Sequence, residues 1–113
     1  MSDIDELGIE AVVEEALASV DPEGGRSIHL SFDIAALDPA EAPATGTPVR
    51  GGLTLREGMK LCQLLSLTGK LRAMDLVEVN PSLATDKKEA DRTVSAANNI
   101  VLAALGFRDC SPL

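Results

Sequence analysis

The sequence predicts an α/β protein whose helices and strands alternate in the order α-β-α-β-α. Two apolar segments of strand character, residues 28–32 and 71–79, are separated by a stretch with helical periodicity. A strand, a crossing helix and a second strand form a right-handed βαβ unit, so we expect two neighbouring parallel strands. The length of 113 residues and the hydrophobic content of 45% suit a single packed domain.

The first half of the chain is expected to hold a helix, a short strand and a long loop. Apolar residues recur at helical spacing from Asp5 to about Val20, and the Asp-Pro-Glu-Gly-Gly run at 21–25 ends that helix. The strand at 28–32 follows. The Pro- and Gly-bearing stretch 38–52 then reads as a long loop, a kind of segment that is often functional in compact domains.

The second half carries clear helix boundaries. Thr54 and Glu57 fit a capping box, which predicts a helix from there to about Thr68. The apolar run of the second strand, 71–79, predicts burial on both faces, as in parallel sheets. Asp86 can cap the last helix, which keeps its apolar stripe until Gly106 ends it.

Charge and cysteine content narrow the class of protein. The net charge of -8 disfavours nucleic acid as a partner, because phosphates require clustered Lys and Arg. There is no apolar run of about 18 residues to span a membrane, and the acidic start is opposite to the basic start of a signal peptide. We therefore expect a cytoplasmic protein, in which Cys62 and Cys110 stay reduced.

Three carboxylates fall near the ends of the two predicted strands. Asp33 follows the first strand, and Asp75 and Glu78 lie in the second. Ligands of open α/β sheets bind outside the carboxyl ends of the strands, so we expect these three side chains to share one edge. Taken alone, an aspartate at a strand end is more often a turn former or helix cap.

The segments around these residues resemble the signature of the arginases, manganese-dependent hydrolases of the ureohydrolase superfamily. The chain reads Ser-Phe-Asp-Ile-Ala-Ala-Leu-Asp-Pro at 31–39, Ala-Thr-Gly-Thr-Pro at 44–48 and Met-Asp-Leu-Val-Glu-Val-Asn-Pro-Ser-Leu at 74–83. The resemblance covers nearly the whole chain but only the C-terminal part of such an enzyme. It implies that residues 1–113 are a partial arginase-like domain, the C-terminal part of a three-layer αβα fold with a parallel sheet.

The resemblance also assigns roles to individual residues. The aspartate matching Asp33 bridges two manganese ions in the family, whereas Ala35 stands where the family has a second ligand aspartate. The glutamate matching Glu78 receives the substrate guanidinium, and the threonine matching Thr47 hydrogen-bonds the active-site carboxylates. Thr47 could equally be required for the geometry of its turn. Asp33 and residue 35 are expected to point to the same side of an extended segment, so that an aspartate at 35 would restore a ligand, but only when the N-terminal part of the enzyme is supplied.

Other polar residues are given ordinary roles. Asp38 is expected to act in a turn or cap, because the family has an aspartate there alongside its two ligands. His29, within an apolar strand, is expected to be buried and hydrogen-bonded rather than a ligand. Arg56 and Glu57 could form a surface pair or contribute to a subunit contact, since arginases commonly assemble as trimers.

Two hypotheses about function follow. The first is a segment of an arginase, the manganese-dependent enzyme of arginine metabolism and the urea cycle that hydrolyses L-arginine to L-ornithine and urea; alone, with one ligand of the set and no assigned catalytic residue, it is expected to be inactive. The alternative is a non-catalytic paralogue that associates with an arginase-type oligomer and modulates it. Ala35 favours the second hypothesis, and the retention of the other motifs favours the first.

Overall fold

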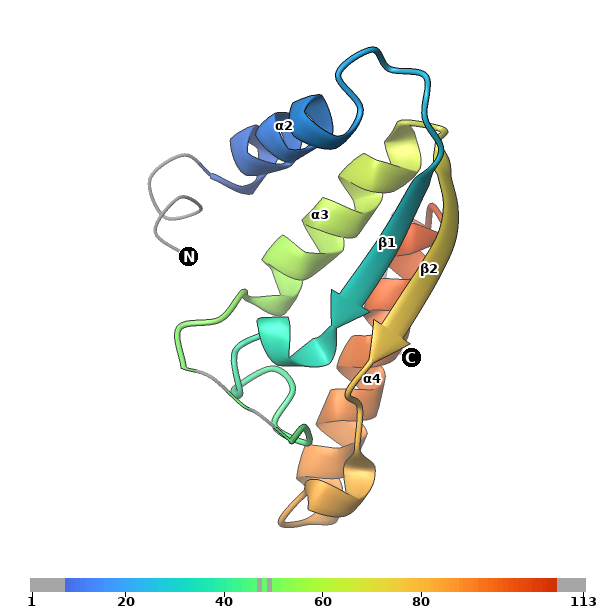
Figure 1. The fold of residues 1–113 in the computed structure, drawn as a ribbon. Helices are drawn as coiled ribbons and strands as arrows, with labels where there is room; N and C mark the ends of the chain where they lie inside the picture. The colour runs from blue at the N-terminus through green and yellow to red at the C-terminus, as the bar shows by residue number, and fades with distance from the viewer. Residues whose placement is uncertain (1–7, 47, 49, 108–113) are drawn as a thin grey trace.

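The predicted order of helices and strands is confirmed by the structure, a computed structural model that describes residues 8–46, 48 and 50–107 (Figure 1). The elements are helix α2 (Ile9–Val20), strand β1 (Ile28–Asp33), a 3-10 turn η1 (Ile34–Ala36), helix α3 (Leu55–Leu67), strand β2 (Leu71–Val77), a second 3-10 turn η2 (Pro81–Leu83) and helix α4 (Lys87–Ala104). The expected helix start at Asp5 lies outside the described residues. None of the described helices is long and apolar enough to cross a membrane.

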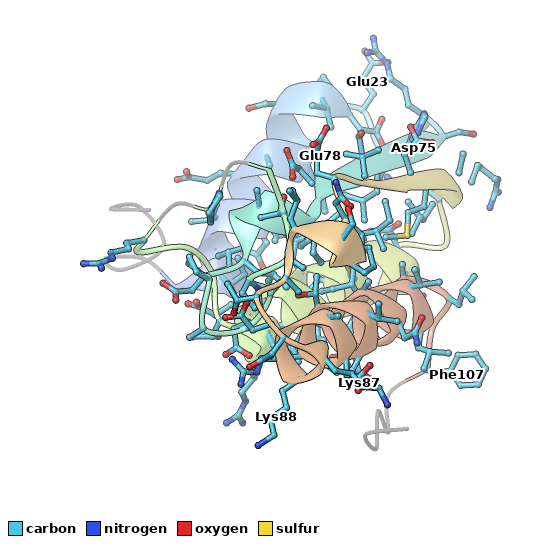
Figure 2. The ribbon with its side chains drawn as sticks, turned by 90° about the horizontal axis from the view of Figure 1, so that it is seen from below. Glu23, Asp75, Glu78, Lys87, Lys88 and Phe107 are labelled. Carbon is cyan, nitrogen blue, oxygen red and sulfur yellow. The ribbon has the colours of Figure 1, made fainter. Side chains whose placement is uncertain are left out.

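β1 and β2 pair in parallel, as expected, with Asp33 opposite Val77 at their carboxyl ends. Helices α3 and α4 lie on one side of this two-stranded sheet (Figures 1 and 2). Every second residue of β1 faces them, and the alternate residues are exposed. In β2, Ala73 and Val77 are likewise exposed. The prediction that the second strand is buried on both faces is therefore wrong, because in the described residues a single helical layer covers one face of the sheet.

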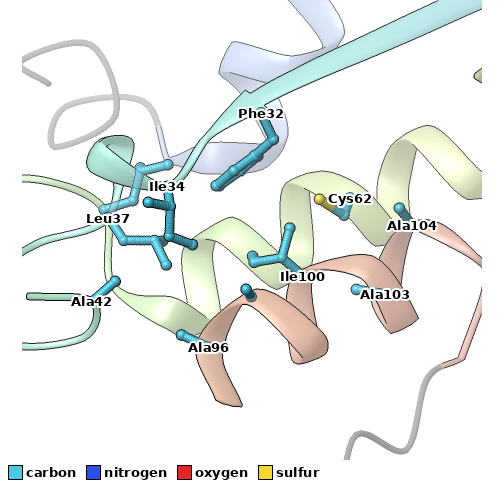
Figure 3. Close-up of a cluster of buried hydrophobic side chains, with 11 residues drawn as sticks. Phe32, Ile34, Leu37, Ala42, Cys62, Ala96, Ile100, Ala103 and Ala104 are labelled. Atoms are coloured by element: carbon cyan, nitrogen blue, oxygen red, sulfur yellow. The ribbon is translucent and has the colours of Figure 1, made fainter. Parts of the chain in front are cut away.

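The core fills the space between the sheet and the two helices. Phe32, Ile34 and Leu37 come from the end of β1 and the turn after it, and they meet the α3–α4 pair (Figure 3). Small residues of α4 let the two helices approach closely around Ile100, which is fully buried. Cys62 of α3 is a free thiol in this core, and burial raises its pKa to about 12. Cys110 lies outside the described residues.

The caps predicted for the last two helices are both confirmed. The Thr54 hydroxyl accepts from the Glu57 amide at 3.1 Å, and the Glu57 carboxylate accepts from the Thr54 amide at 3.0 Å, which completes the capping box of α3. The Asp86 carboxylate accepts from the Glu89 amide at 2.8 Å at the start of α4. These bonds satisfy amides that the helix itself leaves without partners.

Asp38 has the turn role that the sequence predicted, and it holds together the two ends of the long loop. Its carboxylate accepts from the amide of Ala40 at 2.9 Å and from that of Gly51 at 3.0 Å. The hydrogen bond from the Ala40 amide is the main reason why the pKa of the Asp38 carboxyl lies below its usual value, and the bond from Gly51 adds to it. A side chain at Gly52 would approach the backbone of residues 36–38 to 2.7–2.8 Å, so only glycine fits where the loop returns.

Asp21 links the end of α2 to the start of β2. Its carboxylate is buried, accepts from the Lys70 ammonium at 2.6 Å and also accepts from the Arg26 amide at 3.0 Å. The hydrogen bond from Lys70, opposed by burial, holds the pKa of the Asp21 carboxyl below its usual value of 3.8.

This lowered pKa predicts a loss of stability in acid. A carboxyl whose pKa falls on folding stabilises the protein above its ordinary pKa, and that contribution disappears as the pH drops through the folded-state value. We expect Asp21→Asn to lower the melting temperature at about pH 7 and the difference to narrow below about pH 4. Thermal melts across this range check it, with Glu23→Gln, an exposed carboxyl in the same loop, as the control. Parallel curves for the original chain and Asp21→Asn down to the acid limit would contradict the assignment.

Candidate functional site at the carboxyl edge of the sheet

Asp33 ends β1 and begins the turn that follows. Its carboxylate oxygen Oδ1 accepts from the Ala35 amide at 2.8 Å, which caps η1 and fixes the orientation of the exposed carboxylate. Residues 34–36 form a 3-10 turn rather than an extended segment. The expectation that Asp33 and residue 35 lie on one side of an extended strand is therefore wrong. Since the bond comes from the backbone of residue 35, an aspartate there would retain it.

Glu78 follows β2 directly, next to the Asp33–Val77 pair, so Asp33 and Glu78 lie at the same edge of the sheet as predicted. Among the described residues, Glu78 is the one non-glycine residue with a positive φ, at 71°. This left-handed conformation costs a residue with a side chain of order 1 kcal/mol or more and persists where the surroundings enforce it, often at functional sites. No residue pattern around Glu78 indicates this strain.

The strained backbone at Glu78 should affect the stability of variants at this position. Glycine adopts a positive φ without steric cost, so we expect Glu78→Gly to be more stable than Glu78→Ala by about 1 kcal/mol. Both variants lose the carboxylate, and their difference therefore isolates the backbone term. Urea unfolding followed by circular dichroism measures it. Equal stability of the two variants would show that the Glu78 backbone is not strained in solution.

Asp75 does not join this edge. It lies within β2 opposite Ser31, and its carboxylate bonds the His29 ring nitrogen Nε2 at 2.9 Å across the strands. Figure 2 places Asp75 on the side of the sheet away from α4. The prediction of three shared carboxylates was wrong because the second strand ends at Val77, two residues beyond Asp75. His29 is hydrogen-bonded as expected, but it is exposed rather than buried.

Ala44 and Thr45, which precede the Gly-Thr-Pro segment in sequence, come near this edge. Thr47, the predicted contact of the active-site carboxylates, lies outside the described residues. Its neighbour Thr45 is buried, and within the described part of the chain the Thr45 hydroxyl has no hydrogen-bond partner. The carbonyl of Ala44 accepts from the Asn80 amide at 3.0 Å, which ties Ala44 to the segment after Glu78. Sequence analysis missed this tie, since backbone bonds between distant loops leave no residue pattern.

The described residues do not by themselves fit a pair of metal ions. In residues 8–46, 48 and 50–107, no three His, Cys, Asp or Glu side chains gather as a metal site would require. Asp33 offers one carboxylate, of which one oxygen already accepts a backbone amide. Any such site must therefore take further ligands from outside this set.

Arg56 and Glu57 lie elsewhere. The Glu57 carboxylate is used in the capping box, and both residues line a groove of about 760 Å³ bounded also by Ile9, Leu55 and Met59. The groove is lined by residues of α2, α3 and the long loop, and neither Asp33 nor Glu78 is among them. The subunit contact weighed for these residues stays a prediction.

A parallel βαβ unit with two carboxylates at the carboxyl ends of its strands defines an α/β protein of the kind that binds ligands at this edge. The comparisons with known proteins name the family. A sequence model of the Arginase family matches residues 1–106, and the chain belongs to this family.

Similarity to individual proteins supports the same family. The arginase of Schizosaccharomyces pombe is 53% identical over 106 residues, which are 94% of this chain and 32% of that protein. The mitochondrial arginase-2 of Rattus norvegicus is 52% identical over the same length, which is 30% of that protein. A crystal structure of arginase from Bacillus subtilis superposes with a TM-score of 0.83 at 37% identity, over 96% of this chain and 36% of that one. The chain thus spans about a third of the length of these relatives.

Proposed function

We propose that this chain supplies one side of an arginase site, which becomes complete only with a part of the fold that these residues do not provide. The observation that carries the proposal is the strained Glu78 beside Asp33 at the carboxyl edge. Two residues that the family resemblance assigned separately, to substrate and to metal, thus lie at the carboxyl ends of neighbouring strands. The strained backbone of Glu78 favours a functional position over an ordinary strand end.

Each residue has a defined task in this proposal. The Glu78 carboxylate accepts from the guanidinium of L-arginine, a planar donor that pairs with carboxylates through two parallel hydrogen bonds. Two manganese ions are the cofactor that the resemblance implies, and Asp33 is the carboxylate that this chain offers to them. The reaction would consume L-arginine and water and release L-ornithine and urea.

A second candidate function rests on Ala35. The loss of a ligand aspartate amid otherwise retained motifs favours a non-catalytic paralogue that associates with an arginase-type subunit and changes its assembly or stability. The two candidates predict the same fold and the same docking to the remainder of an arginase. They differ in whether the complete assembly turns over arginine once an aspartate replaces Ala35.

Complementation tests the proposal. The part of the Schizosaccharomyces pombe arginase outside the region matched by this chain is co-expressed with the chain carrying Ala35→Asp, and urea release is measured with manganese present. We expect activity that falls about a hundredfold or more in kcat/KM when Glu78→Gln is added, since an amide cannot form the charged pair.

The control variant is Glu23→Gln, an exposed carboxyl at the opposite edge of the sheet, which should leave kcat/KM within about twofold. A stable complex without any urea release would favour the non-catalytic paralogue. Activity that Glu78→Gln leaves unchanged would remove Glu78 from the site.

A further inference from the structure

Thr93 is a polar residue on the buried face of α4. It shares that face with Ala96, Ala97 and Ile100 at helical spacing, and it is fully buried. A buried hydroxyl among apolar neighbours requires hydrogen-bond partners, because a buried polar group without them is strongly destabilising. Thr93 has two. Its Oγ1 donates to the Glu89 carbonyl at 2.9 Å and accepts from the Ala44 amide at 2.9 Å.

Ala44 connects Thr93 to the segment next to the candidate site through its two backbone hydrogen bonds. It is fully buried, and while its amide donates to Thr93, its carbonyl accepts from the Asn80 amide at 3.0 Å. Asn80 stands two residues after Glu78 and begins η2, where its side chain accepts from the Ser82 amide at 3.2 Å. Thr93, Ala44 and Asn80 thus form a chain of hydrogen bonds from α4 to the segment that carries Glu78.

Glu78 needs such support because its backbone is strained. On one side it is held by Val77, which pairs with Asp33 in the sheet. On the other side, among the described backbone hydrogen bonds, the Asn80–Ala44 bond joins this stretch to a segment distant in sequence. Without the Thr93 hydroxyl, the Ala44 amide would be buried without a partner, and the loop would shift to find one. Such a shift would release Asn80 and let Glu78 relax toward an ordinary φ.

We propose that Thr93 is a positioning residue for the arginase reaction, which acts through Ala44 and Asn80 to hold the Glu78 carboxylate where it receives the guanidinium. The inference rests on the proposed function for its last step. Its first steps concern the hydrogen bonds alone and can be tested without activity.

The variants are Thr93→Val, which keeps the shape and removes the hydroxyl, and Thr93→Ser, which keeps the hydroxyl. Thr68→Val is the matched control. The Thr68 hydroxyl also donates to a helix carbonyl, that of Leu65 at 2.7 Å, and accepts a backbone amide, that of Lys70 at 3.1 Å, but at the opposite edge of the sheet.

The first readout is amide hydrogen exchange of the chain followed by NMR. Thr93→Val should raise the exchange rates of the Ala44 and Asn80 amides about tenfold or more, while Thr68→Val leaves both near their original rates. If Thr93→Val does not fold, Thr93→Ser decides, since its freer hydroxyl should raise exchange a few-fold at these two amides before others in the loop. Two results would show that these hydrogen bonds do not act together. One is an unchanged exchange rate of the Asn80 amide in the folded Thr93→Val variant, and the other is a rise in exchange rates spread evenly over all residues in Thr93→Ser.

The second readout uses the complemented enzyme carrying Ala35→Asp. Thr93→Val should raise the KM for L-arginine about tenfold with a smaller change in kcat, Thr93→Ser should restore it, and Thr68→Val should leave it unchanged. Faster exchange at Asn80 with an unchanged KM would overturn the positioning role. If no complemented enzyme is active, the proposed function is wrong, and the exchange rates still decide whether Thr93 holds Asn80 through Ala44.

Discussion

L-Arginine hydrolysis by the isolated chain is expected to stay at the level of a metal-free blank at every manganese concentration. The described residues bring together no set of three metal-ligating side chains, and Ala35 stands where the family resemblance places a second aspartate. A single carboxylate cannot organise two ions at the spacing of about 3.5–4 Å that two-metal hydrolysis requires. A urea-release assay on the purified chain with excess manganese checks this expectation.

The control for that assay is a full-length arginase under the same conditions, which shows that the assay detects turnover. Urea release by the isolated chain above the blank would mean that it forms a working site from its own residues. In that case, the view that the site needs a further part of the fold would be wrong.

Replacement of Ile100 by alanine is expected to unfold the chain or come close to it. Ile100 of α4 is fully buried in the core formed with α3 and the end of β1. Truncating such a side chain to alanine costs about 2–5 kcal/mol. A whole domain typically has only about 5–15 kcal/mol of stability, and the part of this chain that the structure describes has one helical layer on one face of a two-stranded sheet. Thermal melting followed by circular dichroism measures the loss.

Val94→Ala is the matched control for Ile100→Ala. Val94 lies on the same helix but keeps 40% of its surface exposed, so we expect the loss to be well under half as large. Equal losses for the two variants would show that the α3–α4 contact does not form the core in solution.

Much of the fold could be predicted because its signals are local. The capping box at Thr54 and Glu57, the cap at Asp86 and the turn role of Asp38 each depend on residues close in sequence or on loop ends with strong preferences. The parallel pairing followed from the order of a strand, a helix and a strand. These inferences needed no knowledge of what else packs on the sheet.

The errors share a different cause. The apolar run of β2 correctly indicates residues fit for burial, but whether both faces are buried depends on what packs on the second face, which the run itself does not encode. Asp75 was assigned to the edge because the end of a strand is uncertain by a few residues. The 3-10 turn after Asp33 and the left-handed backbone of Glu78 are set by tertiary contacts, which an ordinary run such as Val-Glu-Val-Asn does not encode.

Manganese titration calorimetry tests most directly the claim that this chain provides one side of an arginase site. Four samples are compared, namely the original chain and its Ala35→Asp variant, each alone and each with the complementary part of the Schizosaccharomyces pombe arginase. We predict tight binding of two manganese ions only to the complemented Ala35→Asp variant, because only that sample combines a second aspartate with the ligands that this chain lacks. Equally tight binding of two ions by the complemented original chain, or by either chain alone, would contradict this account of the site.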